Sequence, residues 1–205
     1  MVNKHRFPDG MKSLVDYGHS LGLKVGSYLN NCICMDKDPE PKYEEDVAWF
    51  LAAGFDEVKI DNCGSSHNVS HYSELFNASG KAIRIEDCHT SPTHPDVLAD
   101  GTISCPMNMY RAGGDIKASF GSIIGEIYST VQWNDRKRPL SFPGCWAYPD
   151  MMQVGNFHGA EPLRSAEERT HFSLWVINSA PLVPVAVGET VVLLHPALPL
   201  VGVSI

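Results

Sequence analysis

The sequence predicts an α/β fold built around a parallel sheet. Segments with helical periodicity alternate with short apolar runs along most of the chain, and the connections between them are short and rich in Gly and Pro. The chain has 205 residues, 43% of them hydrophobic, which suffices for one compact domain with a sizeable core. A formal net charge of −8 disfavours binding to nucleic acid or to an anionic membrane surface.

Helices are expected where apolar side chains recur at helical spacing between start and stop signals. Pro8, Asp9 and Gly10 open the first helix, and Gly22 is a natural stop after it. Gly54 is a natural cap for the second helix, whose apolar side chains share one face. The predicted helices cover about residues 11–19, 43–53, 70–77, 116–128 and 166–178.

Strands are expected in the apolar runs that alternate with these helices, because a strand of a parallel sheet is buried on both faces. The predicted strands cover about residues 23–28, 55–60, 82–86, 107–111 and 181–187.

Polar and ionisable side chains gather where these strands end and in a later Pro-Gly turn. They are Asn30, Asn31, Asp61, Asn62, Cys63, Glu86, Asp87, Cys88, Arg111, Asp115, Trp146 and Asp150. The C-terminal strand ends of a (β/α)8 barrel form its active-site face, so this pattern favours a barrel with about six of its eight strands in this chain. No dinucleotide-binding Gly-x-Gly-x-x-Gly, P-loop or Gly-x-Ser-x-Gly motif is present.

Several separated segments, in the same order, resemble the landmarks of one enzyme family. They are residues 6–11 (RFPDGM), 22–28 (GLKVGSY), 57–63 (EVKIDNC), 143–156 (PGCWAYPDMMQVGN) and 174–182 (LWVINSAPL). Over about residues 5–183, the chain thereby resembles glycoside hydrolase family 27, the α-galactosidases and α-N-acetylgalactosaminidases.

The resemblance implies an incomplete (β/α)8 TIM barrel over residues 1–187, without the family's first two strands and C-terminal β domain, and a divergent apolar tail over 188–205. It implies a retaining glycoside hydrolase that removes terminal α-galactosyl residues by double displacement and needs no cofactor. The expected partner is an α-galactoside oligosaccharide or glycoconjugate substrate; a homodimer is compatible with this prediction, and no nucleic acid or membrane is expected. Residues 89–91 depart from the α-galactosidase pattern, so the exact sugar stays open.

The resemblance also implies roles for individual residues. Asp61 is similar to the family's nucleophile, and Lys59, two residues earlier, to a contact with the substrate's hydroxyl groups. Strand alternation places both side chains on one face, where the ammonium group would help to keep Asp61 ionised. Arg111 and Asp115 resemble the family's Trp-Arg-x-x-x-Asp pair, which gives Asp115 the acid/base role and Arg111 a substrate-binding role.

Three further side chains are predicted to bind substrate, namely Tyr28, Trp146 and Asp150. A core position suits Trp146 equally well, and Asp150 is a rival acid whose Pro-Asp-Met context suits a turn or a supporting group. Asp87, beside Cys88 at a strand end, is a further catalytic candidate.

Cysteines and glycosylation motifs indicate an oxidising compartment. Six cysteines and two sequons, at Asn68 and Asn77, predict a secreted or a lysosomal or vacuolar protein, although no signal-peptide segment follows Met1.

By resemblance, one disulfide joins Cys32 or Cys34 to Cys63, and a second joins Cys88 to Cys105. Cys145 and the remaining cysteine of the first pair would then be left to pair with each other.

Two other functions stay open as alternatives. A catalytically inactive carbohydrate-binding remnant would keep the motifs without a complete sugar site. A metal-dependent barrel hydrolase would use Cys32, Cys34, His67 and His71, but their spacing lacks a usual zinc framework, so no metal site is predicted.

Overall fold

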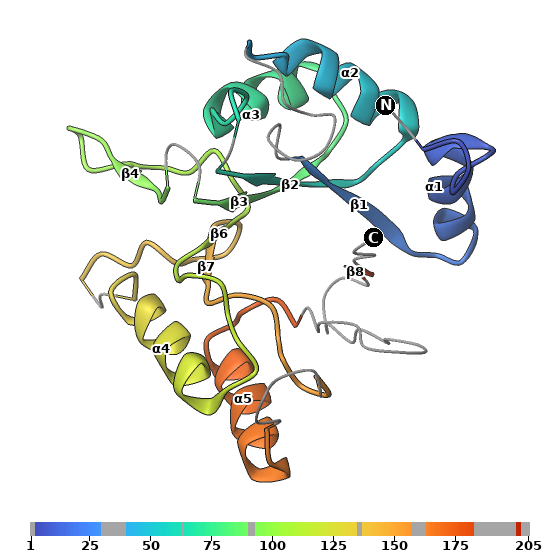
Figure 1. Ribbon diagram of the computed structural model, residues 1–205. Helices are drawn as coiled ribbons and strands as arrows, with labels where there is room; N and C mark the ends of the chain where they lie inside the picture. Colours follow the sequence, from blue (N-terminus) through green and yellow to red (C-terminus); the bar gives the residue numbers. More distant parts are fainter. Residues whose placement is uncertain are drawn as a thin grey trace. The chain divides into compact units, whose positions relative to one another are not determined.

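The structure, a computed structural model, describes residues 3–29, 40–62, 64–89, 93–134, 137–156, 163–182 and 200–201 (Figure 1). The chain divides into two compact units. The first unit comprises residues 1–93 and 199–205, and the second comprises residues 94–198.

A parallel sheet forms the centre of the first unit. Its strands are β1 (Lys24–Leu29), β2 (Glu57–Asp61), β3 (Arg84–Cys88) and β8 (Leu200–Val201), in the order β3-β2-β1-β8. The register pairs Tyr28 with Lys59 and Asp61 with Cys88. The sequence therefore predicted three of these strands, while β8 falls within the segment expected to be a divergent tail.

Three helices accompany this sheet: α1 (Gly10–Ser20), α2 (Tyr43–Ala53) and α3 (Val69–Ala78). Figure 1 shows α2 and α3 on one side of β1, β2 and β3. Gly54 ends α2 with a φ of 90°, a conformation that favours glycine, so the predicted bounds and cap of this helix are confirmed.

Alternation along β2 separates an apolar face of the sheet from a polar one. Val58 and Ile60 are fully buried. Glu57, Lys59 and Asp61 therefore point to the opposite face, as the period of a strand requires. The register of β3 places Arg84, Glu86 and Cys88 beside these three residues, on the same polar face.

The second unit contains two pairs of strands and two helices. Strands β4 (Asp96–Val97) and β5 (Ile103–Ser104) are antiparallel, while β6 (Met109–Arg111) and β7 (Trp146–Tyr148) are parallel. The helices are α4 (Phe120–Val131) and α5 (Ser165–Ile177). Their core includes Met109, Ile123, Tyr148, Met152, Leu163, Trp175 and Ala180.

Two boundaries in the second unit differ from the prediction. Helix α4 begins at Phe120 instead of residue 116, because the Ser119 side chain caps its first turn and the backbone N–H of Ile116 donates to Asp150. In the predicted last strand, Pro181 and Leu182 have no regular structure, and residues 183–187 lie outside the described residues. The short hairpin of β4 and β5 was not predicted.

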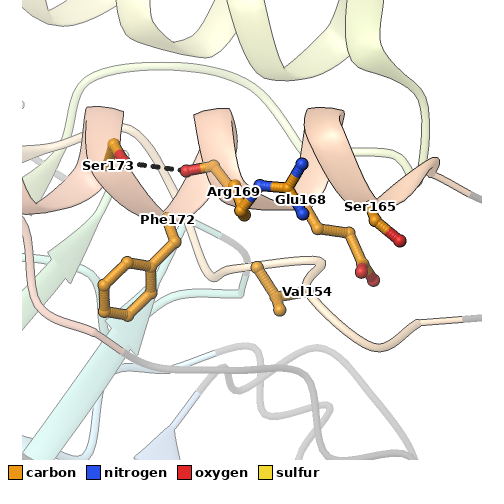
Figure 2. Close-up of a pocket in the computed structure, with 6 residues that line it drawn as sticks. All are labelled: Val154, Ser165, Glu168, Arg169, Phe172 and Ser173. Carbon is orange, nitrogen blue, oxygen red and sulfur yellow. Dashed lines mark hydrogen bonds between the residues drawn. The ribbon is translucent and has the colours of Figure 1, made fainter.

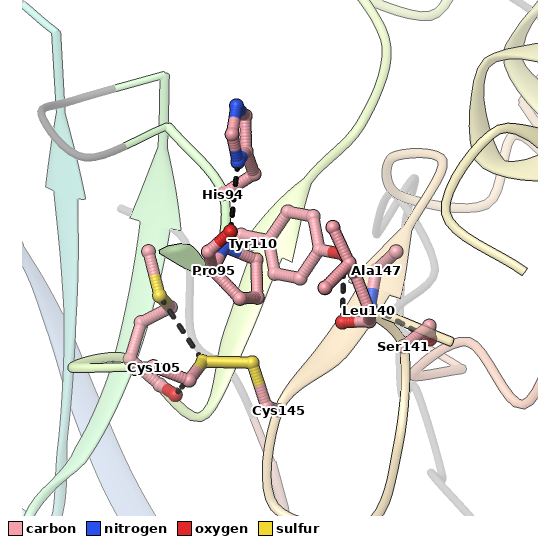
Figure 3. The surroundings of a disulfide bond; sticks show 9 residues. His94, Pro95, Cys105, Tyr110, Leu140, Ser141, Cys145 and Ala147 are labelled. Carbon is pink, nitrogen blue, oxygen red and sulfur yellow. Dashed lines mark hydrogen bonds between the residues drawn. A yellow bond between two sulfur atoms is a disulfide. The ribbon is translucent and has the colours of Figure 1, made fainter. Parts of the chain in front are cut away.

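The described disulfide joins Cys105, which follows β5, to Cys145, which precedes β7 (Figure 3). The Cα atoms of the pair are 6.3 Å apart, a separation that a disulfide can span. The predicted Cys88–Cys105 bridge is therefore wrong, because the sulfur of Cys105 is bonded to Cys145. A bridge from Cys145 to Cys32 or Cys34 is excluded for the same reason. Cys88 is buried at the end of β3, where its side chain hydrogen-bonds to Asp61.

His171 on α5 makes the stability of the fold depend on pH. The ring is fully buried, its Nε2 accepts a hydrogen bond of 2.8 Å from the backbone N–H of Gln153, and burial lowers its pKa from 6.5 to about 4. The unfolded chain therefore binds a proton below pH 6.5 that the folded chain binds only near pH 4. We expect the free energy of unfolding to decrease over this interval by about 3 kcal/mol.

Urea unfolding of the chain at pH 7, 6, 5 and 4.5 measures this effect. His171→Gln keeps a hydrogen-bond acceptor but does not titrate, so its free energy of unfolding should depend less steeply on pH. Parallel pH dependences of the two proteins would contradict the assignment.

Candidate active site

Asp61 lies at the carboxyl end of β2, where three donors surround its carboxylate. The hydroxyl of Tyr28 donates to Oδ2, the backbone N–H of Asn62 donates to Oδ1 over 2.8 Å, and Cys88 adds a side-chain hydrogen bond. Burial raises the pKa of Asp61, but these hydrogen bonds and the charge of Lys59 together lower it below its ordinary value. The carboxylate is therefore ionised at neutral pH while still partly exposed.

Lys59 and Glu86 form an ion pair across β2 and β3. The ammonium nitrogen lies 2.8 Å from Oε1 of Glu86, and both side chains are mostly buried, at 20% and 12% exposure. At the beginning of the same two strands, Arg84 donates to Glu57. The polar face of these two strands thus carries two ion pairs between neighbouring strands, followed by Asp61 at the end of β2.

Glu86 is a site residue that the motif comparison missed. Its signal was nevertheless in the sequence, because alternation along residues 84–88 places Glu86 on the same face as Arg84 and Cys88. The same alternation removes Asp87 as a catalytic candidate next to Asp61. Asp87 is fully buried, and its register partner is Ile60 on the apolar face.

His89, directly after β3, has a φ of 62°. This left-handed conformation is uncommon for a residue other than glycine, and such residues are concentrated at functional sites. His89 directly follows Cys88, the register partner of Asp61.

The second unit holds the predicted acid/base segment after β6. Arg111 pairs with Asp115 over 2.8 Å, and the side chain of Asp115 is 87% exposed. Arg111 also lies 3.5 Å from Asp150, whose side chain is only 7% exposed. Of these two carboxyl groups, Asp115 is the one accessible to a substrate.

The buried carboxylate of Asp150 instead accepts hydrogen bonds from the backbone, one of them from the segment that follows Asp115. Its Oδ2 accepts from the backbone N–H of Ile116 over 2.9 Å, and its Oδ1 accepts from the N–H of Met151 over 2.7 Å. The indole of Trp175 donates to its carbonyl oxygen over 2.6 Å. Trp146 is partly buried and packs against the core of this unit.

Several predicted site residues lie outside the described residues, namely Asn30, Asn31, Cys32, Cys34 and Cys63. In the remainder, no group of three or more His, Cys, Asp or Glu side chains is arranged to hold a metal ion. No helix in this part of the chain is both long and apolar enough to cross a bilayer.

An open pocket of about 400 Å³ lies on the second unit, along α5 (Figure 2). Its lining residues are Val154, Ser165, Glu168, Arg169, Phe172 and Ser173. None of the predicted catalytic or substrate-binding residues contributes to it.

Comparison with known proteins identifies the family. The family model described as alpha galactosidase A matches residues 1–189. An α-galactosidase of Oryza sativa subsp. japonica is 35% identical over 189 residues, covering 88% of this chain and 42% of the relative. An α-N-acetylgalactosaminidase of Rattus norvegicus is 33% identical over 190 residues, covering 86% of this chain and 44% of the relative. The chain thus spans less than half the length of these relatives.

Solved structures show the same fold. An α-galactosidase of Saccharomyces cerevisiae matches with a TM-score of 0.71 and 20% identity, over 90% of this chain and 46% of that one. The fold, the motifs around Asp61 and Asp115 and the match over residues 1–189 agree, and the chain belongs to the alpha galactosidase A family, glycoside hydrolase family 27.

Proposed function

We propose that this chain carries the catalytic groups of a retaining glycosidase that removes terminal α-galactosyl residues. The observation that supports this function best is the environment of Asp61, a partly exposed carboxylate held ionised by three hydrogen bonds and a nearby ammonium group. An ionised, accessible carboxylate is what a nucleophile at the anomeric carbon requires.

In the first step, a carboxylate oxygen of Asp61 attacks the anomeric carbon and forms an ester bond to the sugar. The glycosidic C–O bond breaks, and the leaving oxygen takes a proton from the carboxyl group of Asp115. In the second step, water attacks the anomeric carbon and gives a proton to Asp115, and the electron pair of the ester bond returns to Asp61. The configuration is retained, and double displacement of this kind needs the two carboxyl groups about 5–5.5 Å apart.

In this proposal Lys59 binds hydroxyl groups of the sugar, and its ion pair with Glu86 orients the ammonium group. Tyr28 has a second role beside substrate binding, because its hydroxyl donates to the nucleophile. Arg111 and Asp150 support the acid/base segment, Arg111 through Asp115 and Asp150 through Ile116. Trp146 remains a proposed substrate contact.

The substrate proposed is an α-galactoside oligosaccharide or glycoconjugate. The relatives are α-galactosidases and α-N-acetylgalactosaminidases, and one solved yeast α-galactosidase is a complex with raffinose. We also propose that the described strands and helices form part of a (β/α)8 barrel, which the TM-score of 0.71 to a solved yeast α-galactosidase supports.

A galactose-configured mechanism-based inhibitor tests the proposed nucleophile. We expect an increase in the intact mass of the chain and an adduct on the peptide that contains Asp61. Asp61→Asn should abolish the adduct and lower kcat by roughly 10³-fold or more, because an amide cannot form the ester intermediate.

Asp16→Asn changes an exposed carboxylate on α1 and should leave labelling unchanged. Folded chain that binds galactose without labelling would instead favour the carbohydrate-binding remnant.

The hydroxyl of Tyr28 is expected to set the pKa of Asp61. Tyr28→Phe removes one donor to the carboxylate, so the pKa of Asp61 rises and the acid limb of kcat/KM moves to higher pH by about one unit. Tyr17→Phe, at an exposed tyrosine of α1, is the matched control. An acid limb at the same pH in Tyr28→Phe would refute this role.

Substrates with different leaving groups separate Asp115 from its rival, Asp150. Asp115→Asn should lower kcat/KM for an alkyl galactoside by about 10²–10⁴-fold but kcat/KM for a nitrophenyl galactoside much less, because kcat/KM reports the first step and an acidic phenol leaves without protonation. Asp150→Asn should lower both rates to a similar extent, because it disturbs the support of the segment. The opposite pattern would make Asp150 the acid.

A further inference from the structure

The carboxyl group of Glu126, on α4, lies against the backbone of the segment that carries Asp115. A Cβ atom built on Gly113 would lie 1.7 Å from Oε2 of Glu126 and 2.7 Å from Oγ of Ser129. Gly113 does not have a positive φ, so its conformation does not by itself require glycine. The close approach of Glu126 and Ser129 explains why position 113 has no side chain.

This carboxyl group lies in a setting that disfavours its ionisation. Oε2 is buried, and no donor among the described residues hydrogen-bonds to it. The charged groups that act on it are Arg111 from β6, Asp115 from the following segment and Asp150 after β7. Burial has the largest effect, the two aspartates add to it and Arg111 opposes it, and together they raise the pKa of Glu126 to about 7.

We propose that Glu126 is a positioning residue for the acid/base segment and that it acts with its carboxyl group protonated. The effect of Glu126 on catalysis rests on the proposed function, because Glu126 acts through Asp115 and touches no reacting atom.

The charges around Arg111 explain why protonation matters. Arg111 already pairs with Asp115 over 2.8 Å and lies 3.5 Å from Asp150. An ionised Glu126 would be a third carboxylate competing for the same guanidinium group, and it would leave a buried charge without a hydrogen bond. A protonated Glu126 packs against Gly113 and leaves Arg111 to Asp115 and Asp150.

NMR spectroscopy of the chain tests the geometry without relying on activity. The amide signals of Gly113 and Gly114 should titrate between pH 6 and 8, in step with the side-chain carboxyl carbon of Glu126. Glu126→Gln should abolish the titration of both amides, whereas Asp115→Asn should keep it. Glu74→Gln, at an exposed glutamate of α3, is the charge-matched control and should change nothing. Amides that titrate equally in Glu126→Gln would overturn the proposal.

Gly113→Ala provides a second, independent test. The added methyl group would occupy the place of Oε2, so it should displace the carboxyl group toward solvent. The Glu126 carboxyl carbon should then titrate near the ordinary pKa of a glutamate, about 4.3. An unchanged titration near pH 7 would show that Glu126 does not contact this segment.

The pH dependence of the kinetics tests whether Glu126 supports catalysis. If only protonated Glu126 supports the segment, its loss of a proton lowers wild-type kcat/KM by about tenfold between pH 6 and 8. Glu126→Gln should remove this decrease, and Glu126→Ala should lower kcat at every pH with little change in KM. Equal pH profiles for the wild type and Glu126→Gln would refute the positioning role. A chain without activity in which the two amides still titrate would instead show that the proposed function had failed.

Discussion

The alternation of side chains along β2 is the constraint on which the candidate site depends. Burial of Val58 and Ile60 on the apolar face leaves Lys59 and Asp61 no orientation except the polar one. A shift of one residue in register would bury both charged groups and expose both apolar ones. The packing free energy of the core therefore also fixes where the candidate nucleophile points.

This constraint explains how far the sequence could predict the first unit. Helix α2 and its cap at Gly54 follow from local signals, and the shared face of Lys59 and Asp61 follows from the period of a strand. The hydrogen bond from Tyr28 to Asp61 was not predictable in the same way, because it depends on the register between β1 and β2. For Glu86, strand alternation predicts the polar face of the sheet, but its ion pair with Lys59 depends on the register between β2 and β3 and was not predictable.

In the second unit, tertiary contacts determine features that local sequence signals could not predict. The start of α4 depends on Asp150, which is 34 residues away from the backbone N–H that it binds. The partner of Cys105 is likewise chosen by spatial proximity, which six cysteines in a sequence cannot specify. Motif resemblance pointed to Asp115 and Arg111 as candidates and suggested a supporting role for Asp150. The partners of Asp150 and the approach of Glu126 to Gly113 depend on contacts that no short motif contains.

The carboxyl groups of Asp61 and Glu126 have pKa values shifted in opposite directions, and the difference between these two follows from their hydrogen-bond donors. Burial raises the pKa of Asp61, Glu57 and Glu126 alike. Asp61 accepts three hydrogen bonds and its pKa is lowered overall, whereas the pKa of Glu126 rises to about 7. The pKa of Glu57 also rises to about 7, because burial outweighs the hydrogen bond and the charge of Arg84. Donors placed at one strand end therefore keep the carboxylate of Asp61 ionised, and the absence of a donor to Oε2 of Glu126 among the described residues favours a neutral acid that packs as an uncharged group. A protein that needs one ionised carboxylate and one neutral carboxyl group at the same pH can obtain both by the placement of N–H and O–H groups, without changing how deeply either is buried.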